Sequence, residues 1–502
     1  MTPRLAATFA LTAALGCDAE TPALTDAAVA DRASEDSPVP DVLLSDAVVP
    51  DAVVPDARDV SVADVPASDV PVADAPLPRP SAWVRVLDAS FLVTPAALAV
   101  SPDGSTCVVG DFQGDLRVMG RSITSSGASD GFTACFDPSG ALRFLSASAA
   151  PGDDAFTAAA ADGDELLVAG HLPGPATLGS FALGSAGGVD AVVARFDRAG
   201  RVTRAVSFGG AGSDQPSALA VDGRGHVYVA GTSDQDLRAG SVALRNEGRA
   251  VAWLLELDAS LTPLRGRAFT AGFDAQTTAL RVSNDGAVTL GGQFSGSLTT
   301  GGPVLGATRA QDVFVIRIAP DGQTAWASRY GGGGDDRLHD LAVSPGGEVT
   351  LAGSSGLGRF AFGADEFDVV GSSDGWIARA GADGAPRWSR RVGGDGEDRV
   401  LSLFAGDRGG MAVGRFDRAV ALGDASFTSR GAADAWRASF DEAGAVRGVA
   451  QYGGEGPDVA TAVAAAPGGS VTLGRFAQRA VVAGEAIQTV GIAGAFVHRA
   501  VE

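Results

Sequence analysis

Apolar and polar residues alternate in short runs from about residue 81 onward, and glycine-containing turns separate these runs. The segment LAVDGRGHVYVAGT, residues 219–232, joins a strand of small residues to an alternating strand. Segments such as DVFVIRI, residues 312–318, precede a turn, APDG, and a further alternating run, TAWASRY. Alternation with a period of two predicts β-strands, and no stretch carries apolar residues at the helical spacing. We therefore expect an all-β chain.

A glycine motif divides this region into similar units of about 60 residues. The motif Gly-Gly-x-Gly-x-Asp occupies 209–214, 331–336, 393–398 and 453–458, and shorter versions end at Asp154 and Asp274. The units begin near residues 89, 149, 209, 270, 331, 393 and 453. Four strands per unit are typical of a propeller blade, because one four-stranded sheet covers both faces only between two neighbours. The pattern predicts a seven-bladed β-propeller over residues 81–502. Six blades are the alternative, since the first unit lacks the motif.

The last unit is one strand short. It ends at Glu502 after a third strand, GAFVHRA. The segment AWVRVLD, which starts at Ala82, is similar to AWASRYG from Ala325 and to RWSRRVG from Arg387. We expect this N-terminal strand to complete the last blade, which would pair two sheet edges that otherwise invite aggregation.

The units resemble the SBBP repeats of bacterial β-propellers, which combine a GGxGxD start, a hairpin like AVDxxGNVYVAGxT and a strand like DAFVAxxD. The resemblance covers about residues 82–502 and is closest in LAVDGRGHVYVAGTS, residues 219–233. It implies a propeller fold and specifies no ligand or reaction.

In such a fold the glycine motif is expected to form the turn from the outer strand of one blade to the inner strand of the next. Glycine there adopts positive φ, and aspartate caps backbone amides. A second interpretation concerns the aspartates that share one position before the inner strands, which are Asp154, Asp214, Asp336, Asp398 and Asp458. They would lie near one mouth of the central channel, where carboxylate oxygens suit calcium. A calcium site at this ring is our hypothesis, and the sequence indicates no other cofactor.

The first 17 residues, MTPRLAATFALTAALGC, have one arginine, an apolar stretch from Leu5 to Leu15 and a cysteine. The stretch is too short to span a bilayer and has the proportions of a secretory signal. Its end, AALGC, resembles the lipobox of bacterial lipoproteins, although Ala14 stands where that family usually has leucine. The resemblance implies acylation of Cys17 and a lipid anchor in the bacterial cell envelope, in either membrane or at the cell surface. An ordinary secreted protein with an incidental Cys17 is the alternative.

Residues 18–80 have a different composition, with 14 acidic residues, three arginines and no aromatic residue. Aspartate recurs at intervals of five over much of the segment, as in SDAVVPDAVVPDA. A spacing of five fits neither a helix face nor a strand face, and proline recurs throughout. We therefore expect an extended, disordered acidic tether between the signal peptide and the propeller.

Charge and cysteine content restrict the function further. The formal net charge is −22 and lysine is absent, which excludes Schiff-base chemistry and a P-loop lysine. Such an acidic chain is an unsuitable partner for nucleic acid. Cys107 and Cys135 fall on neighbouring predicted strands of the first blade and on the same face, as a disulfide requires. We predict that they are bridged, because the chain is expected to be exported to an oxidising compartment.

No set of residues in the sequence forms a recognisable catalytic constellation, so we predict no catalytic residues. The interpretation we favour is a monomeric, membrane-anchored binding or scaffolding module with an unknown protein or glycan ligand. The alternative is a propeller enzyme, a lyase or hydrolase, with its site at one mouth of the central channel. Histidine, arginine and aspartate clustered at that mouth would favour this alternative.

Overall fold

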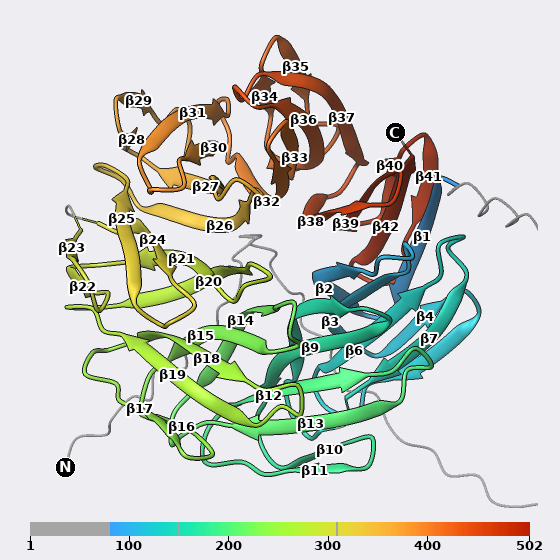
Figure 1. Cartoon of the computed structure of the whole chain (residues 1–502). Coiled ribbons are helices and arrows are strands. Elements are labelled where there is room, and N and C mark those ends of the chain that lie inside the picture. Colours follow the sequence, from blue (N-terminus) through green and yellow to red (C-terminus); the bar gives the residue numbers. More distant parts are fainter. Residues whose placement is uncertain (1–80, 149, 308–309, 502) are drawn as a thin grey trace, which may run out of the picture. The chain divides into compact units, whose positions relative to one another are not determined.

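The computed structural model describes residues 81–148, 150–307 and 310–501, which contain 42 strands and no helix (Figure 1). The predicted signal peptide (1–17), the predicted tether (18–80) and Cys17 lie outside these residues. Within the described residues, therefore, no helix is available to cross a membrane.

The strands form a seven-bladed β-propeller, which confirms seven blades over six. Each blade has an inner strand beside the central channel, a second, a third and an outer strand, all paired antiparallel. The inner strands are β2 (Leu92–Val100), β8 (Ala155–Asp162), β14 (Asp214–Val221), β20 (Ala275–Val282), β26 (Asp336–Val343), β32 (Arg399–Gly406) and β38 (Val459–Ala466). The second strands are β3 (Thr106–Gln113), β9 (Glu165–Leu172), β15 (Val227–Ser233), β21 (Val288–Phe294), β27 (Val349–Gly356), β33 (Gly409–Phe416) and β39 (Gly469–Phe476).

The other strands complete the blades and link them. The third strands are β6 (Asp130–Phe136), β12 (Asp190–Phe196), β18 (Val251–Leu257), β24 (Asp312–Ile318), β30 (Ser373–Ala380), β36 (Asp434–Asp441) and β42 (Gly494–Val501). The outer strands are β7 (Leu142–Ala147), β13 (Val202–Phe208), β19 (Pro263–Phe269), β25 (Thr324–Tyr330), β31 (Pro386–Val392), β37 (Val446–Gly454) and β1 (Trp83–Ala89). Short hairpins lie between the second and third strands and are β4 (Asp115–Val118) with β5 (Arg121–Thr124), β10 (Ala176–Leu178) with β11 (Phe181–Leu183), β16 (Leu237–Ala239) with β17 (Val242–Leu244), β22 (Ser297–Thr299) with β23 (Val304–Gly306), β28 (Arg359–Phe362) with β29 (Asp365–Asp368), β34 (Ala419–Leu422) with β35 (Ala425–Thr428), and β40 (Arg479–Val482) with β41 (Glu485–Gln488).

The ring closes as predicted, by an N-terminal strand that completes the last blade. Strand β1 pairs antiparallel with β42, with Trp83 opposite Arg499 and Val86 opposite Phe496. In Figure 1 the blue end of the described chain lies beside the red end. Strand β1 also pairs with β4 of the first blade, so it joins the last blade to the first.

The apolar core lies between neighbouring blades. Seven clusters of buried apolar side chains occur, one at each junction between blades. At the junction of the last and first blades, for example, Leu87 packs with Phe112 and Val497. Each blade therefore depends on both neighbours for the burial of its two faces.

Tryptophan side chains on three outer strands fasten their blade to the next one. The indole Nε1 of Trp83 donates to the backbone oxygen of Pro138, at 3.2 Å. Equivalent bonds from Trp326 to Ala382 and from Trp388 to Glu442 measure 2.8 and 2.9 Å. The similarity that aligned these three tryptophans in the sequence thus reflects one repeated contact.

The predicted disulfide between Cys107 and Cys135 is confirmed. The two residues lie directly opposite each other on β3 and β6, with Cα atoms 4.0 Å apart. The bridge therefore joins the second and third strands of the first blade, next to the closure of the ring.

Closure by β1 can be tested by truncation. A chain that begins at residue 81 should melt like the full chain. A chain that begins at residue 91 lacks Trp83 and Leu87 and leaves an edge of β42 unpaired, so its melting temperature should fall by about 5 °C or more. Thermal denaturation followed by circular dichroism measures this, and equal melting temperatures for the two truncations would contradict the closure.

Candidate functional site

The glycine motif forms the turn that leads from an outer strand to the next inner strand. In the fourth-to-fifth blade turn, Gly331 has φ +133°, and the amide of Gly332 donates to Asp336 Oδ2 at 2.7 Å. The same bond, again at 2.7 Å, occurs from Gly210 to Asp214, from Gly394 to Asp398 and from Gly454 to Asp458. These contacts agree with the expected roles of glycine and aspartate in the turn.

Each of the five aspartates of the calcium hypothesis lies near a further aspartate that does not belong to this set of five. The partner stands at or next to the start of a third strand in the preceding blade. The pairs are Asp130 with Asp154, Asp190 with Asp214, Asp312 with Asp336, Asp374 with Asp398, and Asp434 with Asp458. All ten side chains are buried. We call these five arrangements the carboxyl pairs.

A glycine of the turn lies against each of three carboxyl pairs in closely similar ways. A Cβ added to Gly209 would come within 1.9 Å of Asp190 Oδ1 and 2.8 Å of Asp214 Oδ2. A Cβ on Gly331 would likewise meet carboxylate oxygens of Asp312 and Asp336 at 2.6 and 2.5 Å. The first glycine of the motif is therefore required by the close approach of two carboxyl groups.

The two remaining junctions lack both members of the pair. Where the third blade meets the fourth, the equivalent residues are Val251 and Ala275, because Asp274 lies one residue earlier and pairs its backbone with Ala250. Where the last blade meets the first, they are Gly494 and Val93. Since both carboxyl groups are present together or absent together, the two members of a pair depend on each other.

Burial makes these carboxyl groups weaker acids than usual. It raises the pKa of Asp154, Asp214 and Asp336 to about 6, and that of Asp398 and Asp458 to about 7, with a further contribution from the charge of each partner. In every pair one buried oxygen has no hydrogen-bond partner, namely Oδ1 of Asp154, Asp190, Asp336, Asp398 and Asp434. A proton on one member of such a pair removes the repulsion between the two negative charges.

The central channel is a cavity of about 430 Å³ lined by the inner strands of all seven blades. Most of its lining residues are small, but the fourth to sixth blades contribute charged and polar groups. Arg281 donates to Asp340 across 2.9 Å, and the Ser402 hydroxyl donates to the same carboxylate at 2.8 Å. His339 also lines the cavity, with Nε2 at 2.8 Å from the Ser354 hydroxyl.

Four arginines gather at the mouth of the channel where the inner strands begin, and we call this set the arginine mouth. Arg337 and Arg399 follow the motif aspartates of the fifth and sixth blades. Arg415 pairs with Arg399 across β32 and β33, and Arg475 has the same position in β39. Burial and the neighbouring Arg415 lower the pKa of both Arg399 and Arg475. Positive charge is thus concentrated on one side of a mouth in an acidic protein.

The arginines affect the histidine in the channel, and an acidic residue of the neighbouring first blade lies beside them. Burial, with the nearby Arg399 and Arg337, lowers the pKa of His339 to about 3, so this imidazole is neutral. Asp111 occupies in the first blade the position that Arg475 has in the last. Burial, together with the nearby Asp153, raises the pKa of Asp111 to about 6.

Sequence reasoning missed both the arginine mouth and the third-strand aspartates. The arginines could have been found from the alignment of the units, since Arg415 and Arg475 both stand in Gly-Arg-Phe and Arg337 and Arg399 both follow a motif aspartate. The third-strand aspartates stand 24 residues before their partners and outside the glycine motif.

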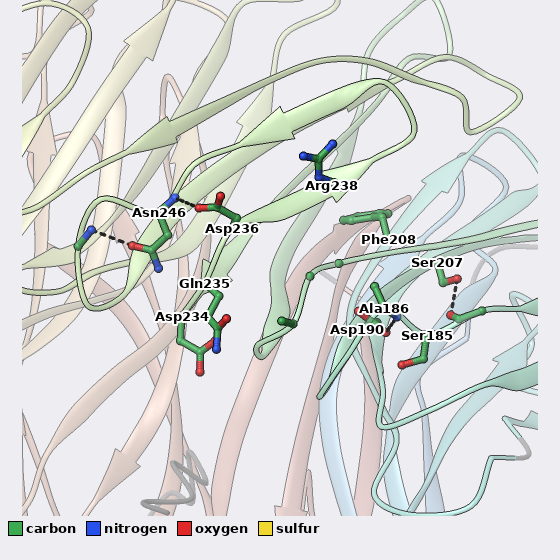
Figure 2. Close-up of a pocket in the computed structure, with 15 residues that line it drawn as sticks. Ser185, Ala186, Asp190, Ser207, Phe208, Asp234, Gln235, Asp236, Arg238 and Asn246 are labelled. Atoms are coloured by element: carbon green, nitrogen blue, oxygen red, sulfur yellow. Dashed lines mark hydrogen bonds between the residues drawn. The ribbon is translucent and has the colours of Figure 1, made fainter.

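A larger cavity of about 840 Å³ lies on the rim between the second and third blades (Figure 2). Its carboxylates already cap loops, because Asp234 accepts from the Ser213 amide and Asp236 from the Asn246 amide, each at 2.8 Å. Asp190 accepts from the Ala186 amide at 2.7 Å. These bonds give the lining acids a structural role, and we place the candidate site at the arginine mouth instead.

Among the described residues, no group of three or more histidine, cysteine, aspartate or glutamate side chains is placed to hold a metal ion. The five aspartates of the calcium hypothesis are distributed over five junctions as carboxyl pairs. Calcium binding by these residues therefore stays a hypothesis for experiment.

No family model matches the chain. The chain is 26% identical over 362 residues to the regulatory protein FlaEY of Caulobacter vibrioides, a match that covers 66% of this chain and 37% of that protein. Among solved structures, Sqt1 of Chaetomium thermophilum is 14% identical, with a TM-score of 0.38 over 78% of this chain and 82% of its own. A protein of unknown function from Bacteroides caccae is 9% identical, with a TM-score of 0.31 over 62% and 94%. These structural likenesses are too weak to bear on function.

The carboxyl pairs predict an unusual dependence of stability on pH. Folding raises the pKa of the motif aspartate in each pair to about 6 or 7, so between about pH 4 and pH 7 the folded chain holds more protons than the unfolded chain, and stability should fall as pH rises through this range. The variant Asp398→Asn can accept from Gly394 and donate to Asp374. It should raise the free energy of unfolding by about 1–3 kcal/mol at pH 8 and change it little at pH 5.

Urea denaturation at the two pH values measures this difference. The exposed Asp424 provides the matched control, Asp424→Asn, which should leave both values unchanged. If Asp398→Asn instead lowered the free energy of unfolding at pH 8, by at least as much as at pH 5, the charged form of Asp398 would be the stabilising one.

The calcium hypothesis predicts binding heat when calcium is titrated into the protein at pH 7.5, a rise in melting temperature and the loss of both in Asp398→Asn. Isothermal titration calorimetry decides this, and the absence of heat at millimolar calcium would end the hypothesis.

Proposed function

We propose that this chain is an exported bacterial lipoprotein whose propeller serves as a non-enzymatic binding or scaffolding module. Export and anchoring rest on the signal-like segment of residues 1–17 and the lipobox-like position of Cys17. An acidic tether over residues 18–80 would hold the propeller away from the membrane surface. The binding role rests on one observation, which is the arginine mouth.

The arginine mouth is suited to hold a ligand because its charge is incompletely neutralised within the described residues. Arg399 forms an ion pair with Glu397, and Arg415 donates to Asp417 at 2.8 Å. The side chains of Arg337 and Arg475 form no ion pair or hydrogen bond with other described residues, although Asp111 lies near enough to Arg475 for their charges to interact. A guanidinium whose own donors are unpaired is stabilised when an anionic ligand arrives.

The 26% identity to a regulatory protein of Caulobacter vibrioides agrees with a binding role. A propeller fold does not decide function, so a binding role is argued from a site on one face of the ring. For this chain that face would be the one that carries the arginine mouth.

A propeller enzyme is the second candidate, because histidine, arginine and aspartate do gather at one mouth of the channel. Asp111 has a raised pKa, which suits a general acid or base, and it lies near enough to Arg475 for their charges to interact. This alternative predicts turnover of a bound ligand that Asp111→Asn abolishes while binding is kept. Product analysis after incubation with a ligand identified by pull-down tests it.

Anchoring through Cys17 predicts that the full-length protein fractionates with membranes and enters the detergent phase, because acyl chains bury apolar surface in lipid. The variant Cys17→Ser should be recovered in the soluble fraction. Immunoblotting of cell fractions measures this, and an unchanged membrane association of Cys17→Ser would refute the lipid anchor.

Binding at the arginine mouth predicts that the protein captures a component of envelope fractions, and that Arg475→Ala reduces this capture at least about tenfold. Arg408, an exposed arginine in the turn after β32, provides the control Arg408→Ala, which should capture as well as the original. Equal capture by both variants would remove the arginine mouth from the binding surface.

A further inference from the structure

One junction between blades contains a cavity where several others contain an aromatic ring. The comparison uses the outer-strand residue that pairs with one fixed position of the third strand. Three junctions have a tryptophan there, which is Trp83, Trp326 or Trp388, and the first-to-second junction has Phe144. Each of these rings packs with the apolar cluster of its junction. At the third-to-fourth junction the residue is Arg265.

The cavity beside Arg265 has a volume of about 350 Å³, and we call it the junction cavity. Its floor is apolar, because Leu254, Val288 and Ile318 are buried members of the cluster at this junction. The equivalent space beside Phe144 measures only about 10 Å³. The slender arginine side chain therefore leaves open a volume that an aromatic ring fills elsewhere, and this volume is within the range of small-molecule sites.

The next blade supplies a turn glycine that lies against the ring at the aromatic junctions. A Cβ added to Gly384 would come within 2.8 Å of the Trp326 ring. Gly322 is the equivalent glycine at the junction cavity, and a Cβ there would meet the guanidinium of Arg265 instead. The flat backbone surface that receives a ring is thus kept at a junction that has no ring of its own.

The second-to-third junction shows that an arginine at this position does not by itself leave a cavity. Arg204 stands there in place of the aromatic residue. The turn of the next blade, however, has Leu261 where the others have glycine, and this buried leucine belongs to the apolar cluster of the junction. The junction cavity therefore depends on the combination of Arg265 with Gly322.

The turn beside the junction cavity also keeps the hydrogen-bond acceptor that the indoles use. At the fourth-to-fifth junction, Trp326 Nε1 donates to the backbone oxygen of Ala382 at 2.8 Å. The equivalent oxygen at the junction cavity belongs to Pro320 and accepts from Arg265 Nη2 at 3.3 Å. A carbonyl oxygen has two lone pairs, so it can accept from the N–H group of a bound ring as well.

An arginine that covers the ring is kept in the same way. The Cζ atom of Arg85 lies 5.3 Å from the centre of the Trp83 ring, and its Nε donates to the Gly140 oxygen at 2.7 Å. Arg267 follows Arg265 by the same two residues and lines the junction cavity. Its Nη1 donates to the Gly322 oxygen at 3.3 Å. A guanidinium over an aromatic face is attracted to it, so Arg267 is placed to cover a ring.

We propose that the junction cavity binds a planar aromatic ring with an N–H group, of about the size of indole. The ring would lie on the apolar floor between Gly322 and Arg267, with its N–H group directed at the Pro320 oxygen. A free indole compound and the tryptophan side chain of a protein partner offer the same chemistry. This site is separate from the arginine mouth, and the inference does not depend on the proposed function.

Calorimetric titration of the full-length protein with indole tests the proposal. Indole should bind at least about tenfold more tightly than cyclohexanol, which has no flat face, and at least about threefold more tightly than N-methylindole, which has no N–H group. N-acetyltryptophanamide separates the two sources of the ring. Binding comparable to that of indole identifies a tryptophan side chain, and binding of indole alone identifies a small free molecule.

A variant locates the binding by filling the cavity. Arg265→Trp places in the junction cavity the side chain that Trp326 places at the next junction, so it should weaken indole at least about tenfold without lowering the melting temperature. The matched control is Arg204→Trp. It changes an exposed arginine at the junction that Leu261 already fills, and it should leave the affinity for indole unchanged.

A measurement on the unaltered protein is needed as well, because Arg265 also forms an ion pair with Glu256 and its replacement can affect folding. Nuclear Overhauser contacts should join bound indole to the methyl groups of Val288 and Ile318. The proposal would be overturned by contacts elsewhere only, by the absence of binding at millimolar indole, or by unchanged affinity in a folded Arg265→Trp variant.

Discussion

The structure depends on one constraint, which is that each blade must have both of its apolar faces buried by neighbouring blades of the ring. A four-stranded blade has two apolar faces, and each is covered only when another blade packs against it. Seven buried clusters, one at each junction, meet this requirement. The last blade gains its fourth strand because β1 pairs with β42, and β1 joins this blade to the first by also pairing with β4.

The fold was predictable because its physical determinants repeat. Turn glycines, alternating strands and outer-strand tryptophans recur at nearly constant spacing, so errors in one unit are corrected by the others. The disulfide was predictable for the same reason, since the repeat placed Cys107 and Cys135 on adjacent strands. The segment before residue 81 lies outside the described residues, and the predictions for Cys17 and the tether await experiment.

The candidate site was harder to predict because binding residues break the repeat that identifies the fold. Arg475 and Asp111 occupy equivalent positions with opposite charge, so a search for similarity among the units passes over them. Only one aspartate of each carboxyl pair was predicted from the sequence, for a related reason. Asp398 stands inside the glycine motif, whereas Asp374 belongs to a strand of the preceding blade and becomes its neighbour only after folding. Sequence spacing identifies one partner, and only the packing of blades identifies the other.

The strand that closes the ring is also the first strand of the propeller. Any pull transmitted along the N-terminal segment therefore enters the domain through β1, directly at its seam. Because β1 lies between β42 and β4, such a load is shared by two ladders of hydrogen bonds on opposite sides of one strand. Five residue pairs join β1 to β42 and three join it to β4, so tension would be expected to detach the first blade's hairpin before it opens the last blade. A load of this kind is thus borne first by seven residues, from Trp83 to Ala89.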